Sequence, residues 1–110
     1  FNSATTALFG AYKACGIKEG DEIITTPISF VATSNMFVDL GAIPIWCDVK
    51  SDGNIDENYI EKLITNKTKA IVVVDFAGKI TKIDKINKIA KKHNLLVIED
   101  SAHAIGASVD

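Results

Sequence analysis

Four short apolar runs recur along the chain, each bounded by polar or turn-forming residues. They cover residues 22–26, 43–48, 70–74 and 95–99. Continuous apolar runs of this length are typical of strands that are buried on both faces of a parallel sheet. We therefore predict that the four runs lie in one sheet and that most neighbouring pairs are parallel.

The segments between these runs carry apolar residues at helical spacing. A first helix is expected from Ala4 to Cys15, because Gly16 follows where a helix-ending glycine belongs. Residues 30–41 predict a second helix with a buried side running from Val31 to Leu40, and residues 82–94 predict an amphipathic helix with lysines outward.

A further short helix is expected around Ile60, Leu63 and Ile64, with Asp56 as its N-cap. Helices and strands thus alternate along the whole chain. This order predicts an α/β fold in three layers, with a largely parallel sheet covered by helices on both faces.

Composition excludes several classes of function. The 110 residues carry a net charge of −2, and all 12 basic residues are lysine, so the arginine used for bidentate base or phosphate recognition is absent. Nucleic acid is therefore not an expected partner. No apolar run approaches a membrane span, and a cytoplasmic protein is expected. Cys15 and Cys47 lack zinc-ligand spacing, so no metal site is predicted.

The two ends of the chain do not resemble domain boundaries. The chain opens on "FNSATTALFG" without a preceding strand and stops at "GASVD", and neither stretch is a linker by composition. We expect the chain to be a fragment of a longer protein.

An acidic pair stands where the last apolar run ends. Glu99 and Asp100 follow Leu95 to Ile98, and ligands of open α/β sheets bind outside the carboxyl ends of the strands. Asp100 is therefore a candidate site residue. The alternative is structural, since Asp100 or Ser101 could cap a following helix.

The start of the first helix offers a candidate anion site. No dinucleotide-binding G-x-G-x-x-G and no P-loop G-K-[ST] occurs in the chain. Ser3, Thr5 and Thr6 instead stand in the first turn, where free amides and hydroxyl groups can hold a phosphate. The same residue types are also ordinary helix caps.

A phosphate seat, an aromatic residue at Phe30 and an acid at Asp100 are the contacts that pyridoxal phosphate (PLP) requires. Over essentially all 110 residues, the chain resembles the sugar-nucleotide aminotransferases of the DegT/DnrJ/EryC1/StrS family, which have the fold-type-I architecture of aspartate aminotransferase. The resemblance lies in four segments in the family's order, which are residues 3–35, 41–49, 53–78 and 93–107.

The resemblance implies roles for individual residues. Ala4 and Thr5 would bind the cofactor phosphate. The family usually has glycine at the position of Ala4, so Ala4 can present its amide only if it is helical and its φ is not positive. Phe30 would lie against the pyridine ring. Asp100 would bind the ring nitrogen, and His103 would lie beside the ring oxygen. Without the resemblance, Phe30 reads as a core aromatic and His103 as a loop residue.

Asp75, in "DFAG", matches a family position at the end of the central strand and is expected to support the site from there. Glu99 and Ser101 are interpreted as structural. We expect Thr5, Phe30, Asp75, Asp100 and His103 to line one crevice at one edge of the sheet.

By resemblance, the whole protein would be a PLP-dependent aminotransferase that moves an amino group, with glutamate as the expected donor, to a keto group of a nucleotide-linked deoxysugar. The products would serve surface polysaccharide, lipopolysaccharide or antibiotic-sugar biosynthesis, and a homodimer is expected. The family's Schiff-base lysine lies beyond the ring-nitrogen aspartate, and none of the 12 lysines follows Asp100. Residues 1–110 are therefore expected to be an inactive part of the PLP-binding large domain, without the lysine segment and the carboxyl-terminal small domain.

Two alternatives stay open at this point. A sugar dehydratase of the same family replaces the lysine by histidine, and only the segment beyond Asp100 separates the two activities. A receiver-like binding module could use Asp75 as a phosphorylatable aspartate, but its acidic pair should follow the first strand, and "DEIITT" has its acids before that strand.

Overall fold

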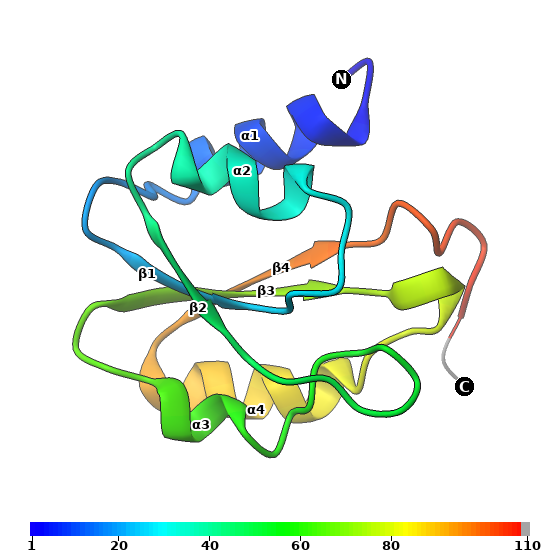
Figure 1. The fold of residues 1–110 in the computed structure, drawn as a ribbon. Coiled ribbons are helices and arrows are strands. Elements are labelled where there is room, and N and C mark those ends of the chain that lie inside the picture. The colour runs from blue at the N-terminus through cyan, green and yellow to red at the C-terminus, as the bar shows by residue number, and fades with distance from the viewer. Residues whose placement is uncertain (109–110) are drawn as a thin grey trace.

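The fold is a four-stranded sheet between two layers of helices (Figure 1). The computed structural model describes residues 1–108, so the last two residues of the "GASVD" ending lie outside it. The strands are β1 (Glu22–Thr25), β2 (Ile43–Trp46), β3 (Thr68–Val74) and β4 (Leu96–Asp100). Their order is β2-β1-β3-β4, and every neighbouring pair is parallel. The predicted parallel sheet is confirmed.

The helices divide between the two faces of the sheet. Figure 1 shows α1 (Ala4–Ala14) and α2 (Ala32–Val38) on one face, and α3 (Ile60–Leu63) and α4 (Ile83–His93) on the other. A short 3-10 helix, η1 (Phe76–Gly78), follows β3. Within residues 1–108, no helix has the length and apolarity that a bilayer span requires.

Two apolar cores result from this arrangement, one on each face of the sheet. Ile23 packs with α1 and α2, and the next residue, Ile24, packs with α3 and α4. In β3, Val72 and Ile71 divide in the same way, because successive side chains of a strand point to opposite faces. The two central strands, β1 and β3, are therefore buried on both faces. The edge strands β2 and β4 are not, since Trp46 is 49% and Leu96 39% exposed, so the expectation of burial on both faces is wrong for these two strands.

The boundaries of α1 and α4 follow ordinary capping chemistry. Ser3 caps α1 by accepting a hydrogen bond from the Thr6 amide at 3.2 Å, and Gly16 has the expected positive φ of 68° just beyond its carboxyl end. Asn94 ends α4 with a φ of 54°, in the left-handed region that asparagine tolerates.

The third helix is shorter than the apolar pattern predicts, and its expected cap is wrong. Asp56 accepts a hydrogen bond from the Asn58 amide at 2.9 Å, a local turn that competes with helix formation. The helix begins only at Ile60, with Tyr59 at its N-cap and no side-chain capping bond. In the second helix Val31 was expected to be buried, but it precedes Ala32 at the start of α2 and is 56% exposed.

Glu57 forms a buried ionic cluster on the face of the sheet covered by α3 and α4. Its side chain is 2% exposed, and its carboxylate lies 2.7 Å from Lys50 Nζ, 3.4 Å from Lys82 Nζ and 3.8 Å from Lys85 Nζ. Burial alone would raise the pKa of this carboxyl, but the hydrogen bond from Lys50 and the nearby charges lower it to about 2. The cluster therefore ties the segment after β2 to the start of α4.

The cluster predicts a specific response to acid. The pKa of Glu57 falls from 4.5 to about 2 on folding, so its contribution to stability is present above pH 4.5 and is lost as the pH falls toward 2. That contribution is at most about 3 kcal/mol. In the full-length protein, Glu57→Gln should lower the unfolding temperature at pH 7 and should flatten its dependence on pH between these values. Glu19→Gln removes an exposed carboxylate and should leave that dependence unchanged. An unaltered acid response in Glu57→Gln would contradict this account.

Candidate functional site

The carboxyl ends of β1, β3 and β4 lie at the same end of the parallel sheet. Val74 pairs with Asp100, so β3 and β4 end side by side, and the Asp75 amide donates a hydrogen bond to the Asp100 carbonyl at 3.2 Å. Figure 1 shows the amino-terminal end of α1 and the loop that enters α2 at this same end of the molecule. The candidate site is therefore built from segments that lie far apart in the sequence.

Asp100 is the last residue of β4 and is 9% exposed. Its Oδ2 accepts a hydrogen bond from Thr33 Oγ1 at 2.6 Å, and its Oδ1 accepts a longer one from the Ala102 amide at 3.3 Å. Residues 101–108 form turns and no helix, so Asp100 caps no helix in the described chain. Glu99 is exposed and points to the opposite face of the strand, which leaves Asp100 as the acid of the site.

Thr33 links Asp100 to the two helices above the sheet. Thr33 is 1% exposed in the first turn of α2, and its carbonyl accepts a hydrogen bond from the Tyr12 hydroxyl at 2.7 Å. Burial, assisted by the charge of Asp100, raises the pKa of Tyr12, so the phenol stays a donor throughout the physiological range. The Tyr12 ring also packs edge-on against Phe37 with centroids 5.5 Å apart.

Asp75 is buried, at 2% exposure, and both of its side-chain oxygens have partners. Oδ1 accepts a hydrogen bond from the Thr81 amide at 2.9 Å, and Oδ2 accepts one from Ser101 Oγ at 2.6 Å. Asp75 therefore joins the segment before α4 to the loop that follows Asp100. This geometry is consistent with the expected supporting role, and it gives Ser101 the structural role that the sequence predicts.

At the start of α1, some residues make capping hydrogen bonds and others have polar groups with no partner within residues 1–108. Ser3 is the N-cap, and Thr6 Oγ1 donates to Asn2 Oδ1 and lies equally close to the Ser3 carbonyl, both at 3.0 Å. For the amides of Ala4 and Thr5, and for the Thr5 hydroxyl, residues 1–108 provide no acceptor or donor. Ala4 is helical and does not have a positive φ, so the alanine that replaces the family's glycine presents its amide.

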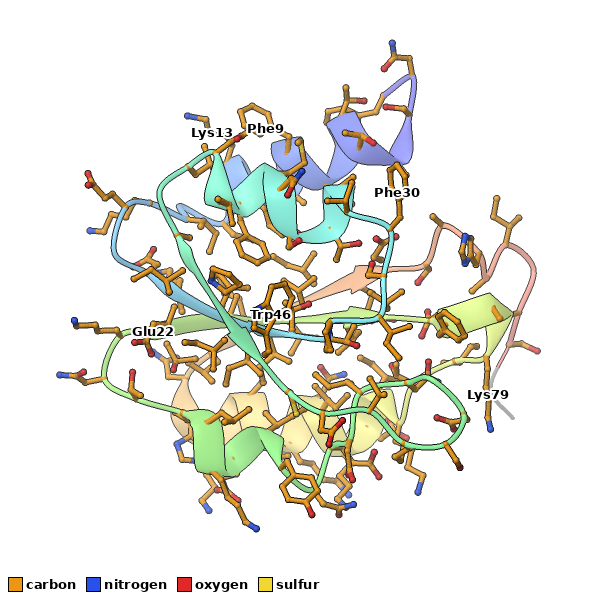
Figure 2. All side chains as sticks on the ribbon, viewed as in Figure 1. Phe9, Lys13, Glu22, Phe30, Trp46 and Lys79 are labelled. Carbon is orange, nitrogen blue, oxygen red and sulfur yellow. The ribbon has the colours of Figure 1, made fainter. Side chains whose placement is uncertain are left out.

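Phe30 and His103 lie in loops at the same end. Phe30 is 70% exposed and lies on the loop just before α2 (Figure 2). An aromatic ring so exposed on an ordered loop is not a core residue. His103 is exposed in the loop after β4, and its carbonyl oxygen lies 3.1 Å from the Cβ position that a side chain at Gly78 would occupy. The close approach packs this loop against η1.

One cavity lies apart from the predicted site residues. The structure contains an open cavity of about 510 Å³, and its walls come from Ile80 to Lys88 at the start of α4. None of the six predicted site residues contributes to those walls.

The sequence reasoning missed Tyr12, Ser29 and Thr33. Ser29 Oγ is hydrogen-bonded to Thr33 Oγ1, which in turn contacts Asp100. One signal could have identified Thr33, because it stands four residues before Phe37 and so shares the buried face of the helix. A polar residue on a buried helix face needs a hydrogen-bond partner.

Comparisons with known proteins agree on one family. The sequence model of the DegT/DnrJ/EryC1/StrS aminotransferase family matches residues 1–110. A Helicobacter pylori protein named UDP-4-amino-4,6-dideoxy-N-acetyl-beta-L-altrosamine transaminase is 51% identical over 109 residues, covering 97% of this chain and 29% of that protein. The chain therefore spans less than a third of this relative's length.

Two solved structures are similar across nearly all of the chain. Helicobacter pylori PseC, an aminotransferase involved in the biosynthesis of pseudoaminic acid, has a TM-score of 0.96 and 49% identity, covering 100% of this chain and 30% of its own. NtdA of Bacillus subtilis, solved with bound cofactor PMP, has a TM-score of 0.92 and 38% identity, covering 94% of this chain and 24% of its own.

The contacts of Asp75 predict that it stabilises the strand ends. Asp75→Ala would leave the buried Thr81 amide and the Ser101 hydroxyl without their acceptors, at a cost of about 2–3 kcal/mol in the free energy of unfolding. Ser101→Ala removes one of these bonds and should cost about 1 kcal/mol. Denaturant unfolding of the full-length protein measures both. Equal stability of Asp75→Ala and wild type would show that these bonds do not hold the loops.

Proposed function

The chain belongs to the DegT/DnrJ/EryC1/StrS aminotransferase family, and from this premise we propose that it is part of the PLP-binding large domain of a sugar aminotransferase. The whole protein moves an amino group, with glutamate as donor, to a keto group of a nucleotide-linked deoxysugar. The names of the Helicobacter relatives, a transaminase of a UDP-linked amino sugar and an aminotransferase involved in the biosynthesis of pseudoaminic acid, support this substrate class.

The residues at the strand ends fit PLP in three respects. Within residues 1–108, two amides and a hydroxyl at the start of α1 have no hydrogen-bond partner, so they are available to bind a phosphate. The Phe30 ring is exposed beside this end of the sheet, and Asp100 supplies a carboxylate at a strand end. The PMP bound to NtdA, which is the aminated form of PLP, supports the same cofactor. When bound, PLP acts as an electron sink that stabilises negative charge on the substrate carbon.

Ala4 and Thr5 hold the phosphate in this proposal. Their amides point along the axis of α1 toward its amino-terminal end, where the helix dipole favours an anion. The Thr5 hydroxyl adds a third donor. No cationic side chain is needed for this contact, which suits a chain whose lysines lie on turns, strands and helix faces elsewhere.

Phe30 would lie against the cofactor ring. Asp100 would bind the ring nitrogen, and its negative charge would favour the protonated, positively charged nitrogen. His103 would lie beside the ring oxygen. Asp75 acts indirectly. It accepts a hydrogen bond from Ser101, and this bond holds the loop between Asp100 and His103.

In this proposal the proton-transferring lysine and the small domain belong to the rest of the protein. The enzyme is expected to be a homodimer. A cytoplasmic enzyme is proposed. The family's sugar dehydratases are the second candidate activity, since a histidine in place of the lysine separates them and the position lies outside residues 1–110.

The observation that carries the proposal is the position of Asp100, a carboxylate at the same end of the sheet as the unpaired amides of α1. The test uses the full-length protein with PLP, L-glutamate and a panel of UDP- and dTDP-linked keto-deoxysugars, with products analysed by mass spectrometry. Replacement of the keto oxygen by an amino group supports the aminotransferase. Loss of a hydroxyl group identifies the dehydratase, and amino transfer only to free keto acids would overturn the sugar substrate.

Two substitutions should separate cofactor binding from chemistry. Asp100→Asn keeps the shape but removes the charge, so the single-turnover rate of amino transfer should fall by about two or more powers of ten with cofactor in excess. Thr5→Ala removes one phosphate contact and should weaken cofactor binding by about tenfold, while the rate at saturating cofactor changes little. Stopped-flow kinetics and cofactor titration measure the two effects. A wild-type rate in Asp100→Asn would show that this aspartate takes no part in the reaction.

A further inference from the structure

Thr33 makes the shortest hydrogen bond to the Asp100 side chain. The hydroxyl lies 2.6 Å from Oδ2, whereas the Ala102 amide lies 3.3 Å from Oδ1. Thr33 and Asp100 are 1% and 9% exposed, so water does not compete strongly for this bond. Threonine in a helix usually returns its hydroxyl proton to a backbone carbonyl of the preceding turn. Thr33 instead gives that proton to a carboxylate 67 residues away in the sequence.

The direction of the bond is set by the charge of Asp100. An ionised carboxylate has no proton to donate, and a threonine hydroxyl has one, so the Thr33 proton lies toward Asp100. The Ser29 hydroxyl then acts as donor to Thr33 Oγ1. Ser29 directly precedes Phe30, so the loop that carries the exposed aromatic ring is tied to the same carboxylate.

The backbone of Thr33 is held from a second side. Tyr12 in α1 donates its buried hydroxyl to the Thr33 carbonyl at 2.7 Å. Because Tyr12 stands two turns after Ala4 and Thr5, α1 connects the unpaired amides to Thr33 and, through Thr33, to Asp100. The Tyr12 bond therefore holds the backbone of Thr33 where its hydroxyl reaches Asp100.

We propose that Thr33 is a positioning residue for Asp100, and that its hydroxyl holds Oδ2 so that Oδ1, whose bond from the Ala102 amide is the longer one, is the oxygen that binds the ring nitrogen of the cofactor. The inference rests on the proposed function and deepens it. Held in this position, the Asp100 carboxylate favours the proton on the ring nitrogen, because opposite charges stabilise each other.

The test compares Thr33→Val, Thr33→Ser and Ser34→Ala in the full-length protein with PLP. Valine matches threonine in shape but lacks the hydroxyl, and serine restores it. Ser34 is the matched control, because it lies in the same helix and its hydroxyl contacts the Val31 carbonyl at 3.3 Å. Thermal unfolding of the cofactor-free proteins shows that each variant is folded. Thr33→Ala replaces Thr33→Val if valine does not fold.

The main readout is the absorbance spectrum of the bound cofactor as a function of pH, with single-turnover kinetics as the second. In Thr33→Val we expect a displaced pH midpoint and a rate lowered by about 10- to 100-fold, the usual effect of losing a partner that orients a ligand. Thr33→Ser should restore the wild-type midpoint, and Ser34→Ala should retain it.

Two different failures are distinguishable. If Asp100→Asn alters the cofactor spectrum but Thr33→Val has the wild-type midpoint and rate, Thr33 does not position Asp100 and the inference is overturned. If the wild-type protein does not take up PLP, the proposed function fails, and the inference fails with it.

Discussion

Parallel pairing of β1, β3 and β4 is the constraint on which the site depends. Parallel strands end at the same edge of a sheet, so the loops after these strands meet there although they are tens of residues apart. The pairing of Val74 with Asp100 sets the register of this edge. A shift of one residue would turn Asp100 to the other face and put Glu99 in its place.

A second set of contacts makes this edge rigid on the side of α1 and α2. The hydroxyls of Tyr12 and Thr33 connect α1, α2 and β4 through two short hydrogen bonds in a buried region. Asp75 does the same on the other side, between the end of β3 and the loop after β4. Asp100 is thus held by contacts from α2 and from the end of β3, as the proposed role of its carboxylate requires.

The sequence predicts those features that depend on local pattern. The strands follow from continuous apolar runs, and the free amides of Ala4 and Thr5 follow from a capped helix start. The role of Thr33 could not be predicted, because it depends on how α2 packs over the end of β4. The prediction that Asp56 caps the third helix was wrong for a local reason. The Asp56 carboxylate accepts a hydrogen bond from the amide of Asn58, and the helix begins only at Ile60.

The central claim is that Asp100 keeps the ring nitrogen of the cofactor protonated. The most direct measurement is the ¹⁵N resonance of PLP labelled at that nitrogen and bound to the full-length protein, recorded above the pH at which free pyridine loses its proton. We predict the resonance of a protonated nitrogen in the wild type, and that of an unprotonated nitrogen in Asp100→Asn. An unprotonated nitrogen in the wild-type protein would contradict the account.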